Sequence, residues 1–144
     1  MIRPPPGQPT VPGESTLGGA VLLGRELVKA FVTAWERVDV DGLVGMLADD
    51  ARFAMPPLPD WFGGRADIRR FVAERMFATP WRLVPMTASG QLAFACYQGD
   101  DDGTSFRMGA INVLTLRGRQ VVEMTGFLDP AVHRAFHLTS EAPR

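Results

Sequence analysis

Few side chains in this chain are able to do acid–base, nucleophilic or metal chemistry. The 144 residues include two histidines, one cysteine and one tyrosine. His133 and His137 have the four-residue spacing of a metal-binding pair on a helix, but no third ligand accompanies them, so we expect no metal site. Cys96 has no base placed near it, which favours a small buried side chain over a nucleophile. Asp60 lies in a proline-rich loop and is expected to be a solvated turn residue.

Asn112 is the polar residue that stands out in the strand predicted over 106–116. Side chains alternate between the two faces of a strand, and the face of Asn112 is otherwise apolar, with Met108, Ala110 and Leu114. A buried asparagine must find hydrogen-bond partners or it costs about 1–3 kcal/mol. Asn112 is therefore either satisfied by its neighbours or a polar anchor inside a cavity, and we leave both open.

Two nearby carboxylates have structural explanations. Glu123 falls on the outer face of the strand predicted over 121–128, and Asp129 stands before Pro130 as the N-cap of a final helical turn. Arg107 also falls on an outer face. A shift of strand register by one residue would turn Arg107, Glu123 and Asp129 inward together, so that arrangement stays an alternative.

The elements that position these side chains are expected to be helices in the first half of the chain and strands in the second half. Apolar residues recur at three- and four-residue spacing, which predicts three helices. The expected helices cover about 22–38, a shorter segment that contains residues 43–47 and has Asp39 or Asp41 as its N-cap, and 66–77. The expected strands cover about 52–55, 82–87, 92–98, 106–116 and 121–128. The last four are joined by short turns and should pair antiparallel, and helices followed by strands favour an α+β fold.

The length and composition fit one domain of ordinary size. A net charge of −1 favours no broad basic face, so we expect no direct nucleic-acid partner. No stretch approaches the roughly 18 apolar residues of a membrane span, and residues 1–20 lack the apolar region of a signal peptide, so we expect a cytoplasmic protein. Five prolines within 4–12 predict a disordered arm over 1–20, followed by the domain over 21–138 and a flexible tail over 139–144.

The inward-facing residues predict a concave sheet with an interior rich in aromatic side chains and methionine. Such an interior is either a plain core or a pocket for an apolar, planar ligand, because methionine adapts to irregular shapes and aromatic rings stack. The expected ligand-binding residues are Phe31, Trp35, Met55, Trp61, Phe94, Met108, Asn112 and Met124. The outer face of the sheet is expected to form a homodimer interface through Tyr97, Ile111, Val113 and Phe127.

The segment 40–53, VDGLVGMLADDARF, resembles the beginning of the SnoaL-like, or nuclear transport factor 2-like, superfamily. The resemblance spans about 22–136. It implies a cystatin-like α+β cone-shaped barrel, in which a curved, mostly antiparallel sheet wraps around three N-terminal helices. That superfamily includes polyketide cyclases, ketosteroid isomerases, limonene epoxide hydrolases and scytalone dehydratases as well as binders without catalysis, so the fold alone does not decide the function.

Shorter motifs carry a narrower similarity. The motifs are FAMPPLP at 53–59, WFGGR at 61–65, WRLVP at 81–85, LTLRG at 114–118 and FLDP at 127–130. Together they look like the C-terminal SnoaL-like domain of actinobacterial extracytoplasmic-function sigma factors. In those proteins the domain follows the promoter-binding regions, which are absent here, and is thought to regulate them.

The enzyme members of the superfamily provide a test for chemistry. In ketosteroid isomerases the resemblance puts the general base at Met55, the oxyanion-hole tyrosine at Phe31 and the protonated aspartate at Asn112. Methionine cannot accept a proton, which excludes isomerase chemistry, while Asn112 stays a plausible neutral donor to a ligand carbonyl. The Asp–Arg–Asp set of limonene epoxide hydrolases has no counterpart on the inward faces.

We therefore predict a small hydrophobic-ligand-binding SnoaL-like domain that acts as a sensor or regulator without a cofactor. The alternative is a stand-alone, cofactor-free enzyme of the polyketide cyclase, isomerase, dehydratase or epoxide-hydrolase type, acting on an apolar metabolite in the same pocket. Carboxylates, histidines or tyrosines converging in the cavity wall would favour the enzyme. A wall in which Asn112 is the polar group would favour binding.

Overall fold

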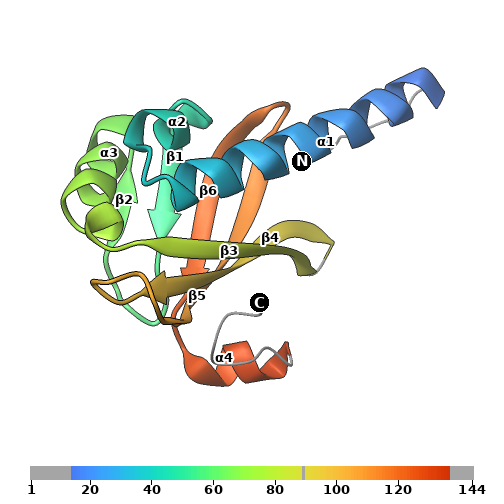
Figure 1. Cartoon of the computed structure of the whole chain (residues 1–144). Coiled ribbons are helices and arrows are strands. Elements are labelled where there is room, and N and C mark those ends of the chain that lie inside the picture. The colour runs from blue at the N-terminus through green and yellow to red at the C-terminus, as the bar shows by residue number, and fades with distance from the viewer. Residues whose placement is uncertain (1–13, 89, 137–144) are drawn as a thin grey trace.

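The computed structural model describes residues 14–88 and 90–136. Its helices are α1 (Glu14–Glu36), α2 (Val40–Val44), α3 (Arg65–Glu74), the 3-10 turn η1 (Met76–Ala78) and α4 (Pro130–Ala135). Its strands are β1 (Leu47–Ala54), β2 (Trp61–Gly63), β3 (Trp81–Ala88), β4 (Gln91–Gly99), β5 (Phe106–Arg117) and β6 (Gln120–Phe127). In Figure 1, α1 runs across the upper part of the molecule, α2 and α3 lie at the upper left beside β1 and β2, and α4 lies at the bottom, below β5.

The six strands form one curved sheet in the order β2-β1-β6-β5-β4-β3. All neighbours pair antiparallel except β1 and β6, which run parallel. The described strands do not close into a complete barrel, because β2 and β3 form the two edges. The predicted α+β class, with a mostly antiparallel sheet and three N-terminal helices, is confirmed.

Helix α1 buries its aromatic stripe as the spacing predicted. Phe31, Ala34 and Trp35 are all at most 3% exposed, and they pack with the sheet in the main core. The end of α1 is held to β3 by the backbone N–H of Leu83, which donates to Glu36 Oε2 at 3.0 Å. The helix begins at Glu14 rather than near Leu22, so residues 14–20 of the predicted arm are helical. No proline lies between Pro12 and Pro56, and proline is what would have broken a helix there. Residues 1–13 and the predicted tail over 139–144 lie outside the described residues.

The segment after α2 differs from the prediction. The Asp39 side chain caps α2 as expected, accepting from the backbone N–H of Gly42 at 3.0 Å, but the helix ends at Val44. Strand β1 begins already at Leu47, which pairs with Val121 of β6. A parallel partner about seventy residues away cannot be read from local periodicity, so the sequence prediction started this strand five residues late.

Two bulges change which side chains share a face. On β4, Cys96 pairs with Ala110 and Tyr97 pairs with Met108, so Gly109 is an extra residue in β5. Met108 therefore shares a face with Tyr97, and its predicted inward direction is wrong. A second irregularity in β6 puts Val121 in the core, whereas strict alternation from an outward Glu123 would put Val122 there.

The outer face of the sheet is partly covered within a single chain. Tyr97 and Ile111 are buried, although both were expected on an open outer face. Helix α4 begins where predicted, with Asp129 accepting from the backbone N–H of Ala131 at 2.9 Å. Buried His133 lies beside this face, with its Nε2 2.7 Å from the carbonyl oxygen of Phe127. A homodimer through this face stays a prediction. None of the helices in the described ranges has the length and apolar composition of a membrane span.

Candidate functional site

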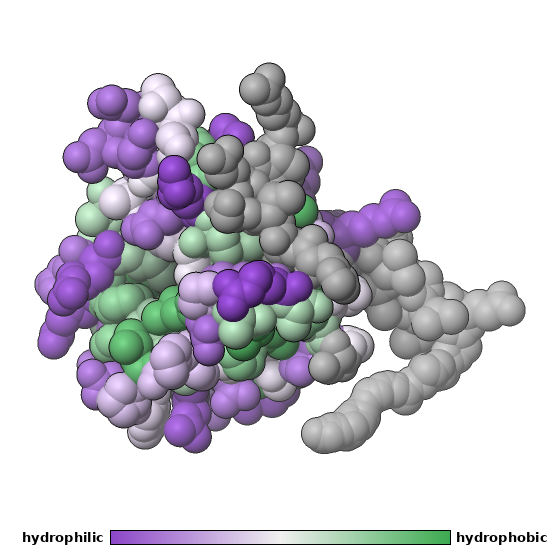
Figure 2. Space-filling model, turned by 90° about the horizontal axis from the view of Figure 1, so that it is seen from below, coloured by the Kyte–Doolittle hydropathy of each residue, from purple (hydrophilic) through white to green (hydrophobic). Residues whose placement is uncertain are grey.

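A cavity of about 250 Å³ lies between the helices and the concave side of the sheet. Its lining comes from α1, β1, α3, η1 and four further strands. The residues are Trp35, Phe53, Met55, Phe71, Arg75, Met76, Trp81, Gln98, Gly109, Ala110, Asn112, Gly126 and Leu128. The face of the molecule seen from below in Figure 2 carries an apolar area bordered by hydrophilic residues.

Aromatic rings form the walls of this cavity and hold one another in place. Trp35 and Trp81 meet edge-on, with ring centroids 5.0 Å apart, and Phe53 and Phe71 meet edge-on at 5.8 Å. The Trp81 indole also donates to the carbonyl oxygen of Met76 at 2.7 Å. Rings fixed at both ends in this way present a preformed apolar surface.

Two glycines leave the space that the polar and aromatic lining residues occupy. A Cβ on Gly126 would lie 2.8 Å from Asn112 Oδ1, and a Cβ on Gly109 would lie 3.1 Å from Trp81 Cζ3. Both distances are shorter than ordinary van der Waals contact. Larger residues at these two strand positions would therefore push Asn112 or Trp81 out of place.

Asn112 is 1% exposed and makes one hydrogen bond with its side chain among the described residues. Its Nδ2 donates to Cys96 Sγ at 3.3 Å, and the thiol in turn donates to the carbonyl oxygen of Phe94 at 3.6 Å. Asn112 Oδ1 has no hydrogen-bond partner in the described protein. The resemblance implied that Asn112 would offer a donor; Cys96 takes one of its two amide N–H groups, the second makes no hydrogen bond among the described residues, and Oδ1 is without a partner.

Trp35 has the complementary property on the facing helix. Its indole Nε1 is buried and donates to no group of the described chain. An indole N–H can only donate and an amide oxygen can only accept. Two residues of the lining thus each have one buried polar atom without a partner in the described chain, where such atoms are ordinarily paired.

The predicted binding residues separate into four groups in the structure. Trp35, Met55 and Asn112 line the cavity, whereas Phe31, Phe94 and Met124 are fully buried in the core and do not line it. Phe31 and Phe94 stack on each other with centroids 4.5 Å apart. Met108 is on the opposite face because of the bulge at Gly109. Trp61 is 54% exposed and lies outside the cavity, with the guanidinium of Arg52 4.2 Å above its ring.

Several lining residues were missed from the sequence. Phe71 and Met76 fall within the helix expected over 66–77 and were not named as binding residues, and Trp81 stood just before the predicted strand. Arg75, in the same expected helix, lies both in the cavity lining and in that of a neighbouring depression that includes exposed Asp60. The WRLVP motif at 81–85 begins with Trp81 and was the sequence signal that could have identified it.

The lining contains no aspartate, glutamate, histidine, tyrosine or cysteine. The alternative set does not converge there: Glu123 is exposed, Asp129 caps α4, and Arg107 is exposed near the other side of the β4–β5 hairpin. Cys96 is fully buried, and burial raises the pKa of its thiol to about 12, so it stays protonated and unreactive. Within 14–88 and 90–136 no cluster of three metal-binding side chains exists, and His137 lies outside those ranges.

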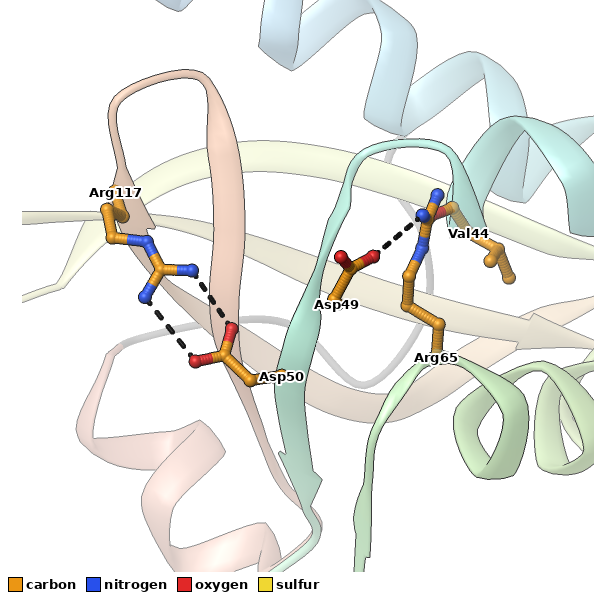
Figure 3. A network of polar contacts seen from close by, with 5 residues as sticks. All are labelled: Val44, Asp49, Asp50, Arg65 and Arg117. Carbon is orange, nitrogen blue, oxygen red and sulfur yellow. Dashed lines mark hydrogen bonds and ion pairs between the residues drawn. The ribbon is translucent and has the colours of Figure 1, made fainter.

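A second polar cluster lies at the beginning of β1, away from the cavity (Figure 3). Arg117 of β5 contacts both carboxylate oxygens of Asp50, at 2.9 and 3.5 Å, and Arg65 of α3 reaches Asp49 at 3.2 Å and the carbonyl oxygen of Val44 at 3.1 Å. The hydrogen bond from Arg117 holds the pKa of Asp50 below its ordinary value. These side chains are largely open to solvent and pair with one another, although Arg65 Nε is buried without a partner in the described chain, so the cluster joins elements rather than forming a site.

Comparison with known proteins agrees with this architecture. Residues 28–124 match the family model of the SnoaL-like domain. The ECF RNA polymerase sigma factor SigG of Mycobacterium tuberculosis strain H37Rv is 29% identical over 118 residues, covering 79% of this chain and 31% of the relative. The chain therefore spans about a third of the length of the curated relative that it matches.

Solved structures show the same fold at low sequence identity. An NTF-2 like protein of unknown function from Burkholderia xenovorans LB400 has a TM-score of 0.65 at 14% identity, covering 76% of this chain and 84% of its own. A protein from Kribbella flavida proposed to be a ketosteroid isomerase has a TM-score of 0.60 at 19% identity, covering 85% and 84%. One from Xanthomonas campestris proposed to be a polyketide cyclase has a TM-score of 0.55 at 20% identity, covering 79% and 96%. The aromatic cavity, the curved six-stranded sheet and the family match together identify the chain as a member of the SnoaL-like domain family with the nuclear transport factor 2-like fold.

Proposed function

We propose that this domain binds a small hydrophobic molecule in the cavity and acts as a sensor or regulator rather than as an acid–base catalyst. The observation that carries the proposal is the composition of the lining. Walls of tryptophan, phenylalanine and methionine suit an apolar, planar molecule, and the polar side chains among them are Asn112, Gln98 and Arg75 besides the indoles. None of these takes up a proton readily at neutral pH, which general base catalysis requires.

The sigma-factor relative supports the regulatory part of the proposal. A domain shared with SigG, on a chain that spans a third of that protein, fits a module that senses a molecule and passes the signal to transcription. Such a regulator would work in the cytoplasm, as a homodimer if the outer face pairs as predicted. The enzyme-like neighbours favour the alternative, a cofactor-free enzyme on an apolar metabolite in the same cavity.

A thermal-shift screen of the whole chain against apolar aromatic and terpenoid compounds tests the proposal. A bound compound should raise the midpoint temperature, because ligands that bind the folded state stabilise it. Met55→Trp should abolish the shift, because a larger side chain at this lining position would fill cavity space. Leu58→Trp is the matched control, since Leu58 lies three residues away, is 51% exposed and does not line the cavity.

The outcomes separate binding from catalysis. A shift that disappears only in Met55→Trp supports the cavity as the binding site, and an equal shift in both variants contradicts it. Mass spectrometry of each compound after incubation then distinguishes the two functions. Recovery of the unchanged compound supports a sensor, whereas conversion that Met55→Trp abolishes would establish the enzyme instead.

A further inference from the structure

A depression of about 520 Å³ borders the cavity and differs from it in charge. The two share Met55, Phe71 and Arg75, which form the border between them. The other residues that line the depression are Leu58, Asp60, Phe62, Asp67, Arg70 and Glu74. It thus has three carboxylates, whereas the described lining of the cavity has none. A molecule that occupies both spaces meets apolar walls at one end and charged side chains at the other.

Arg75 places a positive charge on this border. It is the one charged side chain in the described lining of the cavity, and it lines the depression as well. Its backbone is fixed where α3 passes into η1, because its N–H donates to the carbonyl oxygen of Phe71 at 2.9 Å and its carbonyl oxygen accepts from the N–H of Ala78 at 3.3 Å. Its guanidinium forms no ion pair within the described residues, whereas those of three other arginines do. The charge is therefore available to a ligand.

The carboxylates of the depression do not line the cavity. Asp67 and Glu74 stand three residues before and four residues after Arg70 in α3, so all three lie on one side of that helix. Asp60 belongs to the loop between β1 and β2. Arg70 offsets part of this negative charge, but the depression beyond the border keeps more carboxylates than arginines. An anionic group is therefore favoured beside Arg75 at the border and disfavoured farther out.

A carboxylate is the anionic group that suits Arg75 at this position. The planar guanidinium presents its N–H donors in a fork that matches the two oxygens of a carboxylate. A primary amide of the same shape carries no charge, and an ammonium group would be repelled by the arginine. The rest of the ligand is expected to be apolar, because the cavity walls beyond the border include Phe53 and Trp81, whose rings meet those of Phe71 and Trp35 edge-on.

We infer that the ligand is an amphipathic acid, with an apolar, planar body in the cavity and a carboxylate paired with Arg75 at the border. This inference rests on the proposed binding function of the cavity and adds the charged group by which the site selects its ligand. Arg75 is then the residue that determines this specificity, and Arg70, which lines the depression but not the cavity, is not.

Titration calorimetry of the whole chain with three probes that share one ring system tests the inference. The probes are 2-naphthylacetate, its neutral amide 2-naphthylacetamide, and the cationic 2-naphthylethylamine. We expect the acid to bind about fivefold more tightly than the amide, because a pair with an exposed arginine adds a modest attraction, and the amine to bind most weakly. High salt should reduce this preference, since it screens the pair and leaves the binding of the neutral amide unchanged.

Three variants then assign the preference to one residue. Arg75→Gln removes the charge at similar length, so it should bind the acid and the amide alike. Arg75→Lys keeps the charge without the planar fork and should retain part of the preference. Arg70→Gln is the matched control, since Arg70 is also exposed, lies five residues earlier in α3 and does not line the cavity. This control should keep the full preference for the acid.

The outcomes separate the inference from the proposed function. Equal binding of acid and amide, or tighter binding of the amine, overturns the inference, but supports the proposed function if Met55→Trp abolishes the binding. A preference for the acid that persists in Arg75→Gln, or that Arg70→Gln removes equally, overturns the assignment to Arg75. No binding by any of the three probes contradicts the proposed function as well.

Discussion

Polar groups near the two ends of β1 differ in whether they have partners. Near its beginning, Asp49 and Asp50 are exposed, and both are paired with arginines from other elements. Near its end, Phe53 and Met55 border the cavity, where Trp35 Nε1 and Asn112 Oδ1 are buried and lack partners in the described chain. Charges that solvent would satisfy anyway are paired at the first end, where Arg65 Nε is the one buried atom of the described cluster without a partner, whereas two buried polar atoms at the second end lack partners.

This contrast indicates which region is arranged for structure and which for binding. Exposed ion pairs contribute little to stability, and their role is to join β1 to α3 and β5. An unpaired buried polar atom lowers stability, and it is tolerated where it has another use. The cavity is therefore the region in which unpaired buried atoms lower stability, which the proposed binding function would account for.

A larger residue at position 126, beside Asn112, should have the largest effect on the cavity end of β1. Gly126→Ala places a Cβ 2.8 Å from Asn112 Oδ1, so we expect a loss of about 1–3 kcal/mol in the free energy of unfolding, together with loss of ligand binding. Urea denaturation measures the first effect. The control is Gly24→Ala in α1, whose Cβ would contact nothing within 4 Å and should raise stability by about 1 kcal/mol. Equal stability changes of the two variants would contradict the tight fit at Gly126.

Removing the unmatched acceptor should sharpen the contrast by separating stability from binding. In Asn112→Leu an apolar side chain of similar size replaces a buried amide with an unpaired oxygen, so the free energy of unfolding should be unchanged or higher by about 1 kcal/mol. Urea denaturation at pH 7 measures this. A loss of more than about 2 kcal/mol would mean that the amide is a structural residue, as one of the two sequence interpretations held.

Breaking an ion pair at the other end of β1 should have the smallest effect. The pKa of Asp50 is lowered in the folded protein by its hydrogen bond with Arg117, so the stabilisation is present above the ordinary carboxyl pKa of 3.8. It is lost as the pH falls through the lowered value in the folded state. The midpoint temperature of Asp50→Asn should thus be slightly below that of the parent protein at pH 7, and the difference should disappear in strong acid or at high salt.

The control for this prediction is Asp102→Asn, a change at an exposed turn aspartate that forms no ion pair among the described residues. Its midpoint temperature should follow that of the parent at every pH. If Asp50→Asn behaves like the control, the pair with Arg117 adds nothing to stability. Many exposed ion pairs have no measurable effect of this kind.

Much of the fold follows from local signals. The aromatic stripe of α1, the Asp39 and Asp129 caps, and the turns between the last four strands were all predicted in about the right places, because each depends on residues only a few positions apart. Asn112 was correctly placed on the concave side of β5. That alternation was counted from residues on the same side of the bulge, where the period of two holds.

The predictions that failed depend on distant partners. Met108 was assigned to the wrong face because the extra residue at Gly109 exists only in relation to β4. The early beginning of β1 depends on its parallel pairing with β6, and the role of Trp81 depends on its contact with Trp35. No window of neighbouring residues contains these relations.

The amino-acid sequence by itself determined the α+β class, the family resemblance and the scarcity of catalytic side chains, because these depend on local periodicity, motifs and composition. Tertiary structure alone decided which apolar residues fill the core and which line the cavity, as Phe31 and Trp35 on the same helix face illustrate. It also decided that Cys96 binds the amide nitrogen of Asn112 and leaves the oxygen over. Whether a buried polar atom is satisfied depends on which side chains the fold brings within about 3 Å, and those side chains come from distant parts of the chain.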